Sequence, residues 1–229
     1  MKHVLFLIAV ISICLFLGCS RSQGLHMESI QETLRQESAK FSGDRPENSP
    51  ATSPARRIPS KLGLYAKPTG FLKREFEWTG EDRDTLLFWA KNLQKSGVVT
   101  DAMFVPQSSL KGNTLAELRT SAARYGMDLI LVIDGAVAVD RYNNYKAALL
   151  YWTILGAYLA DGTHSDALCV IHGTLWDVKS GSRLFQEESE GRAQTVGPAA
   201  FVDDDAMVLK ARRQALDRLL DSLANWLVH

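Results

Sequence analysis

The sequence predicts an α/β (α+β) fold: a single three-layer-like domain with a small mixed sheet flanked by helices, after a hydrophobic leader and a polar, proline-rich segment. Two observations predict this class. Segments of alternating or continuous apolar residues are interleaved with helical segments that begin at threonine caps. Near the end, residues 203–227 repeat leucine at helical spacing after three aspartates. We therefore expect three parts, residues 1–18, residues 19–60 and a globular domain over residues 61–229.

The first half of the domain alternates strand and helix. Residues 61–66 alternate apolar and less apolar side chains, which predicts a short strand. Thr79 and Asp82 form a capping-box pattern, so a helix should begin there and end near Gly97. Residues 98–105 then predict a second extended segment.

A second helix and a central strand follow. Thr114 and Glu117 repeat the capping pattern, and Gly126 is placed to end the helix. Residues 128–133 are apolar and rich in branched side chains between turn residues, which predicts a strand buried on both faces. Residues 136–139 extend it.

The last part predicts a hairpin and a helix. Residues 167–178 form a long strand candidate, residues 179–182 have turn chemistry, and residues 183–186 begin the return strand. The acidic residues 203–205 open the final helix. Acidic side chains at a helix start are favoured by the helix dipole, so we prefer that explanation to a metal site.

Composition restricts the class of protein. The 229 residues include 26 basic and 26 acidic side chains, so the formal net charge is zero. Nucleic-acid-binding proteins usually carry a basic excess or a basic stripe. We therefore expect no nucleic-acid partner.

The three cysteines lie in different parts of the chain. Cys14 is inside the leader, Cys19 ends it, and Cys169 lies deep in the domain. If the leader is removed and Cys19 is acylated, one thiol remains, which excludes an intramolecular disulfide. Cys169 lies in an apolar run, so we expect a buried small hydrophobic residue there. A reactive or inter-chain thiol is the alternative.

The leader is typical of an export signal. After Lys2, residues 4–17 are almost entirely apolar, and as a helix they would span about 21 Å, short of the ~30 Å hydrocarbon core of a bilayer. Residues 15–19 (Leu-Phe-Leu-Gly-Cys) resemble the lipobox of bacterial lipoproteins, although Phe16 and Leu17 depart from its usual residues. The alternatives are an uncleaved anchor and an ordinary secretory signal.

The lipobox resemblance implies a covalent lipid on Cys19, and we expect no other cofactor and no metal. Lipoproteins of this class carry three acyl chains, and several buried chains hold a protein firmly to a membrane. Ser20 stands where Asp would resemble an inner-membrane retention signal. The resemblance therefore implies an outer-membrane protein that faces the periplasm.

Residues 20–60 predict a flexible tether. Prolines fall among polar residues there, most densely over residues 44–57, and such a segment buries too little apolar surface to fold alone. About 40 flexible residues would let the domain float roughly 35 Å from the membrane. A short amphipathic helix over residues 27–41, using Ile30, Leu34 and Phe41, is the alternative.

The order of elements resembles small periplasmic α/β domains, among them the curli-secretion lipoprotein and the lipoprotein activator of penicillin-binding proteins. The matching stretches are residues 123–132 (Ala-Arg-Tyr-Gly-Met-Asp-Leu-Ile-Leu-Val) and the hairpin at residues 175–181 (Leu-Trp-Asp-Val-Lys-Ser-Gly). Residues 61–227 also resemble the rhombotarget lipoprotein family, through residues 150–158 (Leu-Tyr-Trp-Thr-Ile-Leu-Gly-Ala-Tyr), Thr163, Asp166 and residues 174–178. That family implies an envelope lipoprotein without an established activity.

Residues 147–160 are the most unusual segment, because they carry no charge and are rich in Leu, Tyr and Trp. Tyr151, Trp152 and Tyr158 could lie at an interface with a membrane or a partner. The alternative is that the segment packs in the core as a helix or a strand, with helix slightly favoured by residues 147–150.

A polar group around two histidines is the candidate for chemistry. His164 and His172, with Asp161 and Asp166, are the residues that an enzyme or a metal site would use. On a strand His172 shares a face with apolar residues, which favours a satisfied core histidine, and the other three indicate an exposed loop. No nucleophile elbow, phosphate loop or metal motif is evident in the sequence, so we name no catalytic residue.

We therefore expect an outer-membrane-anchored lipoprotein with a non-catalytic domain that binds a cell-envelope protein. One alternative is an envelope hydrolase or metal-dependent enzyme that uses groups near His164 and His172. Another is a subunit of a membrane-associated assembly, including a homo-oligomer.

Overall fold

The computed structural model describes residues 22, 24–42, 60–67, 69–70, 75–110, 112, 114–144 and 161–228. In chain order the helices and strands are α2 (Met27–Ser42), β1 (Ser60–Ala66), β2 (Thr69–Gly70), β3 (Glu75–Phe76), α3 (Gly80–Lys95), β4 (Val99–Phe104), the 3-10 turn η1 (Gln107–Ser109), α4 (Leu115–Arg124), β5 (Leu129–Asn143), β6 (Thr163–Asp177), β7 (Arg183–Gly197) and α7 (Asp204–Val228).

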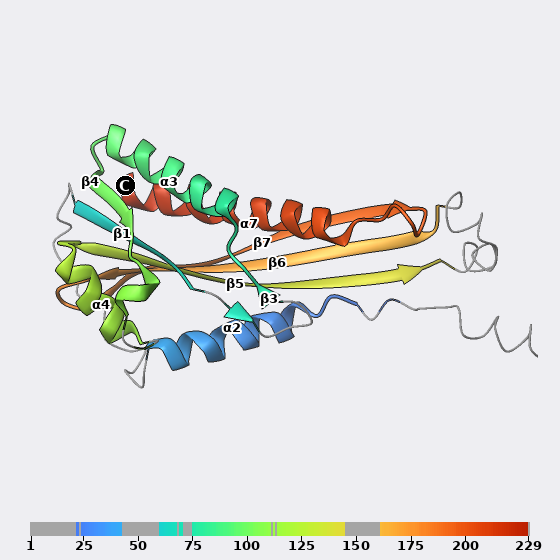
Figure 1. Cartoon of the computed structure of the whole chain (residues 1–229), viewed down its shortest axis with the longest axis horizontal. Coiled ribbons are helices and arrows are strands. Elements are labelled where there is room, and N and C mark those ends of the chain that lie inside the picture. Colours follow the sequence, from blue (N-terminus) through green and yellow to red (C-terminus); the bar gives the residue numbers. More distant parts are fainter. Residues whose placement is uncertain are drawn as a thin grey trace, which may run out of the picture.

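The described strands form a mixed five-stranded sheet in the order β4-β1-β5-β6-β7, with β2 and β3 paired separately. β1 is parallel to β4 and β5, whereas β5, β6 and β7 run antiparallel. Helices α3 and α7 lie on one face, and α2 and α4 on the other (Figure 1). The expected α/β class with a mixed sheet between helices is confirmed.

Two sets of apolar side chains hold the layers together. The larger set joins α3 and α7 to the sheet, with Leu86, Leu216 and Leu219 packed on Leu131 and Ile171. On the opposite face α4 packs on the beginning of β5, and α2 packs further along on β5 and β6. The predicted central strand is therefore buried from both faces, as its continuous apolar run indicated.

The predicted helix starts are confirmed at the level of individual hydrogen bonds. Thr79 accepts from the backbone N–H of Asp82, and the Asp82 carboxylate accepts from the backbone of Thr79, which completes a capping box on α3. Thr114 accepts from the N–H of Glu117 at 3.4 Å. Asp203 caps α7 by accepting from the N–H groups of residues 205 and 206, so this acidic residue serves the helix start.

A buried ion pair connects α3 to α7, beside the exposed pair of Glu81 and Arg213. Asp82 accepts from Arg212 Nη1 at 2.9 Å, and both side chains are buried. The Arg212 guanidinium also lies over the Phe76 ring, 4.8 Å from its centre. One carboxylate therefore caps a helix and neutralises a buried cation, so the two helices are fixed relative to each other.

The expectation of a flexible tether is wrong for residues 27–42. They form α2, whose Ile30 and Leu34 are each 1% exposed against Leu168 and Val170 of β6. The sheet supplies the apolar surface that this polar helix lacks, and docking stabilises a helix that would be marginal in isolation. The folded body therefore begins upstream of residue 61. Residues 1–18 and 43–59 lie outside the described part.

Two glycines allow close packing of the sheet. At Gly191 of β7 an added Cβ would lie 1.9 Å from the carbonyl oxygen of Ala211 in α7. At Gly135 of β5 an added Cβ would lie 2.7 Å from the Phe76 ring. The backbone of α7 thus lies directly on the backbone of β7, which any larger residue at position 191 would prevent.

Cys169 is fully buried on the α7 side of the sheet, as its apolar neighbours predicted. Desolvation raises the pKa of its thiol to about 12, from an ordinary value of 9.0. Unfolding lets this thiol ionise near its ordinary pKa. Its contribution to stability is therefore complete below about pH 9 and is lost as the pH rises toward 12.

We expect Cys169→Ala to flatten the loss of stability in alkali, by about 1.4 kcal/mol per pH unit above pH 9. The measurement is urea unfolding of both proteins at several pH values from neutral to about pH 11. Tyrosines and lysines titrate alike in both proteins, so the difference in slope isolates the thiol. Parallel curves would show that the thiol ionises as readily in the folded protein as in the unfolded chain.

Candidate functional site

The distal end of the sheet is the region where residues far apart in the chain meet. We define it as residues 139–143 of β5, 163–167 of β6 and 193–197 of β7, which are paired with one another. β1 pairs with β5 over residues 129–133 at the other end. The distal end therefore projects beyond β1 and β4 as a three-stranded extension (Figure 1).

An aromatic pair marks this end. The rings of Tyr142 and His164 are stacked, with centres 4.7 Å apart and planes 4° apart. The Tyr142 hydroxyl donates to Asp166 at 3.4 Å. Desolvation, followed by the charges of Asp166 and Asp140, raises the pKa of Tyr142, so the phenol stays protonated as a donor. The pair therefore stiffens the end of the extension.

The segment before α2 binds at the same end. Ser22 donates from its hydroxyl to the Asp140 carboxylate, and the N–H of Gly24 donates to the same carboxylate at 3.0 Å. Gly24 has a φ of 75°, a conformation that glycine adopts without strain. Asp140 is 7% exposed, and these two donors help to offset the cost of burying its charge. The chain therefore enters the folded body at the distal end.

Polar contacts also fix the turn between β7 and α7. Arg141 donates to the carbonyl of Ala199 at 2.8 Å and pairs with Asp204 at 3.4 Å. Ser165 donates to Asp204 at 2.6 Å. Within this turn the Phe201 side chain is 68% exposed. The fixed turn thus presents an aromatic side chain to the outside.

The residues expected to contact a membrane or a partner lie outside the described part. These are Cys19, Tyr151, Trp152 and Tyr158, and the alternatives of core or interface for residues 147–160 fall on the same undescribed segment. Their flanks are described. The N–H of Asn144 donates to the carbonyl of Gly162 at 2.8 Å. The segment between these two residues therefore leaves and re-enters the fold at the distal end.

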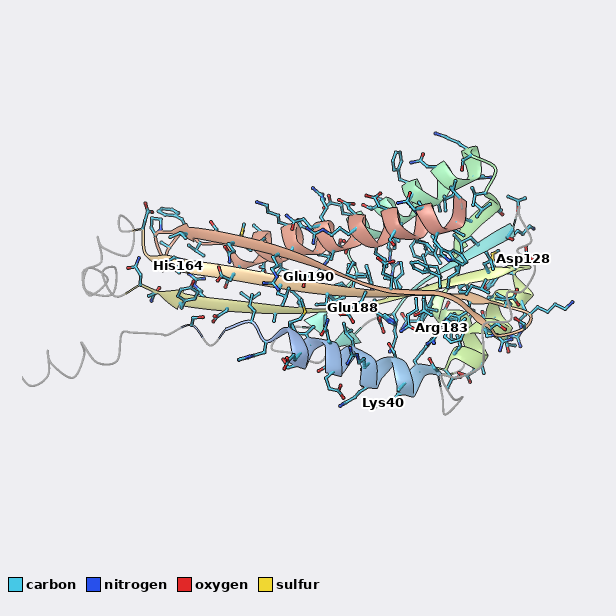
Figure 2. All side chains as sticks on the ribbon, turned by 180° about the vertical axis from the view of Figure 1, so that it is seen from behind. Lys40, Asp128, His164, Arg183, Glu188 and Glu190 are labelled. Atoms are coloured by element: carbon cyan, nitrogen blue, oxygen red, sulfur yellow. The ribbon has the colours of Figure 1, made fainter. Side chains whose placement is uncertain are left out.

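The prediction that the two histidines belong to one polar group is wrong. Both lie on β6, eight positions apart, which corresponds to about 26 Å along a strand. His164 is at the distal end of the sheet. Asp128, just before β5, marks the opposite end (Figure 2). His164 and Asp166 belong to the strand itself and not to a loop, because β6 begins at Thr163. Within the described residues, no group of acidic, histidine or cysteine side chains could hold a metal ion.

His172 belongs to a separate polar cluster beneath α2, and its side chain is 13% exposed. Its Nδ1 lies 3.2 Å from Asp134 Oδ1, and Asp134 is 3% exposed. Lys67 lies 3.9 Å from the same carboxylate and donates to the carbonyl of Glu37 at 3.3 Å. Gln186 Nε2 lies 3.0 Å from His172 Nε2. The cluster joins five segments: α2, the residue after β1, β5, β6 and β7.

This cluster has the residue types of a catalytic triad but not its geometry. A triad needs the serine at one ring nitrogen of the histidine and the carboxylate at the other. Here Ser38 and Asp134 both approach Nδ1, at 3.3 and 3.2 Å. Ser38 also donates to Asp134 at 3.2 Å, so its proton points toward the carboxylate. The arrangement instead supports a largely buried histidine with partners at both ring nitrogens, which agrees with the predicted satisfied histidine.

Sequence reasoning missed Lys67, Asp134 and Asp140. Asp134 follows the apolar run of β5, and a carboxylate in such a run is a signal for a buried, paired charge. Nothing in the local sequence indicates that Lys67 or Ser38 would reach it. Asp140 gave no local signal either, because its partners Ser22 and Gly24 precede it by more than a hundred positions.

Within the described ranges, no helix combines the length and apolar character needed to cross a membrane.

The fold and the site define a class: an α/β domain with a mixed sheet and a distal end that receives the incoming chain. No family model matches the chain, and no curated protein matches it.

The solved structures that match this chain include two proteins named as lipoproteins and one C-terminal domain. A lipoprotein from Neisseria meningitidis is 12% identical, with a TM-score of 0.36 over 74% of this chain and 99% of that one. The LpoB C-terminal domain from Salmonella enterica is 13% identical, with a TM-score of 0.32 over 63% and 90%. The rare lipoprotein B from Shewanella oneidensis is 13% identical, with a TM-score of 0.34 over 73% and 96%. At these identities and TM-scores, the matches assign neither a function nor a partner to this chain.

Proposed function

We propose that this chain is a lipoprotein anchored in the outer membrane through Cys19, and that its periplasmic α/β domain binds a cell-envelope protein without catalysis. One observation carries the proposal: Ser22 and Gly24 bind Asp140 at the distal end. The same end holds the two flanks of the charge-free segment at residues 147–160. The anchor and the proposed contact segment therefore belong to one end of the molecule.

The composition of that segment suits contact with a protein. Tyr151, Trp152 and Tyr158 combine large apolar rings with polar groups, a combination enriched at the centres of protein interfaces. The absence of charge between residues 147 and 160 removes the desolvation cost that charged side chains would add on binding. We place the partner contact at these three aromatic residues.

The proposal of a non-catalytic domain is supported by the geometry of the polar cluster at His172. Ser38 and Asp134 share one ring nitrogen, and the other ring nitrogen faces Gln186. No proton could pass from Ser38 through the ring to Asp134 in this arrangement. Ser38 and Gln186 instead connect α2 and β7 to the centre of the sheet, which is a structural role.

We expect Trp152→Ala to reduce capture of the partner several-fold while the domain stays folded, because truncating an interface tryptophan often removes much of the binding energy. The measurement is crosslinking in the native envelope followed by mass spectrometry, with thermal unfolding of the purified protein alongside. Trp226→Ala is the matched control, since Trp226 lies in the last turns of α7 and is 37% exposed.

Two results would contradict this assignment. Unchanged capture by the Trp152→Ala protein would remove the partner contact from this segment. Loss of folding in that variant, with Trp226→Ala intact, would assign the segment to the core. Crosslinks solely between copies of this chain would favour the oligomeric alternative.

A further inference from the structure

We propose that the distal end of the sheet rests on the lipid surface beside the anchor, with Phe201 and Val196 as the side chains that enter the interface. This inference rests on the proposed lipidation of Cys19. It adds a second membrane contact, made by the folded domain itself, and it fixes which end of the domain faces the membrane.

The chain between Cys19 and the folded domain is short. Two residues lie between Cys19 and Ser22, and the three peptide units that join them span at most about 11 Å when extended. Ser22 is bound to Asp140. A lipid held by Cys19 would therefore keep its leaflet within a short distance of Asp140, and the domain could not move away while this contact persists.

The register of the strands places Val196 near the tip of the distal end. Val196 of β7 is paired with His164, which is paired with Tyr142, two residues beyond Asp140 on β5. Two residues of a strand advance by about 7 Å. Val196 thus lies further out than the point where the anchored chain is attached, and its side chain is 52% exposed.

Phe201 is held in position for such a contact. Its turn is fixed by the bonds of Arg141 to Ala199 and of Ser165 to Asp204. A fixed turn loses little further entropy when its exposed side chain enters an interface, and aromatic rings favour the headgroup region of a bilayer. The phenylalanine is thus exposed on an ordered element and not on a free end.

Exposure by itself would not single out these two residues, because isolated apolar side chains are common on soluble proteins. Phe88 of α3 is 65% exposed, close to the value for Phe201. α3 packs on β4, which pairs with β1 at the end of the sheet remote from Val196. Proximity to the anchored chain is what distinguishes Val196 and Phe201.

Three of the carboxylates at the distal end already hold hydrogen-bond donors or a cation. Asp140 accepts from Ser22 and Gly24, and Asp166 accepts from Tyr142. Asp204 is paired with Arg141. Carboxylates that already hold donors lose less on desolvation than free ones. These side chains therefore do not oppose contact with a surface of mainly zwitterionic lipid.

The test places a fluorescent label at single positions of the full-length, lipid-anchored protein. Phe201→Cys is labelled with an environment-sensitive fluorophore, and Phe88→Cys serves as the matched control. Cys169 is fully buried, so it should stay unlabelled in the folded protein. Each protein is inserted through its lipid into vesicles of phosphatidylethanolamine and phosphatidylglycerol, and quenching by spin-labelled lipids is measured.

We expect quenching at position 201 to be several-fold stronger than at position 88. Equal quenching at the two positions would overturn the proposal. A label at 201 that is shielded from water but not quenched by lipid would also overturn it, and would assign the surface to a protein or to a second copy.

The lipid anchor and the membrane contact of Phe201 can be tested separately in the same preparation. If the Cys19→Ser protein still binds the membrane, the lipid anchor is wrong, and this inference is overturned with it. If Cys19→Ser is released while the label at 201 stays unquenched in the anchored protein, the anchor stands and the membrane contact of Phe201 is wrong.

Discussion

Replacing Cys19 by Ser is expected to release the protein from the membrane fraction. Acylation needs the cysteine sulfur, and a serine hydroxyl does not take its place in the thioether. Each buried acyl CH₂ contributes about 0.8 kcal/mol, so the loss of three chains removes far more affinity than any single protein–lipid contact supplies. The measurement is fractionation of cells by ultracentrifugation, followed by detection of the protein in the pellet and in the supernatant.

Cys14→Ser is the matched control, because it makes the same change five positions earlier, inside the leader. That variant should stay in the membrane fraction. A density gradient of the parent protein then tests the proposed outer-membrane location. Persistence of the Cys19→Ser protein in the pellet, at the level of the parent, would contradict the proposed anchor.

Replacing Gly191 by Ala is expected to cost at least several kcal/mol of folding free energy, and so to unfold a large part of the population. The new Cβ would lie 1.9 Å from the carbonyl oxygen of Ala211 and 2.7 Å from the backbone nitrogen of Ala215. Both atoms are backbone of α7, so no side-chain rotation relieves the contact. The helix would have to leave the sheet, and with it the packing of Leu216 and Leu219.

Two further glycines allow the expected losses of stability to be ranked. At Gly173 the added Cβ would meet side-chain atoms of Leu219 at 2.8 Å, and these can move at a smaller cost. At Gly80, the first residue of α3, an added Cβ meets nothing within 4 Å, so alanine should be neutral or slightly stabilising. Urea unfolding should rank the losses 191, then 173, then 80. A Gly191→Ala protein as stable as Gly80→Ala would contradict the close approach of α7.

Local sequence signals predicted most of the fold. The caps at Thr79 and Thr114 placed the starts of α3 and α4, because their hydrogen bonds involve residues three positions apart. The apolar run at residues 129–133 identified the central strand. These features depend on short-range chemistry, and therefore sequence patterns report them well.

Helix α2 was not predicted as part of the body, for a physical reason. It carries three buried apolar side chains, Ile30, Leu34 and Phe41, among mostly polar neighbours. Such a narrow stripe does not hold a helix in isolation, and its stability depends on docking. The surface that receives Ile30 and Leu34 is made by β5 and β6, more than a hundred positions later in the chain.

The candidate site was predicted in part. His172 was correctly interpreted as a satisfied histidine from the apolar residues that share its strand face, although its side chain is only largely buried. Its grouping with His164 was wrong, because proximity in sequence along a strand does not bring side chains together. The contacts of Asp140 with Ser22 and of Asp134 with Lys67 join distant segments, and no pattern within either segment indicates its partner.

The docked α2 helix also determines what counts as the smallest folding unit. A fragment that begins at Lys61 would lack the covering of Leu168 and Val170, both of which are 1% exposed or less beneath Ile30 and Leu34. Uncovered apolar strands favour self-association. Recombinant work on this protein should therefore start its fragments at or before Ser22, or the resulting aggregation will be mistaken for natural assembly.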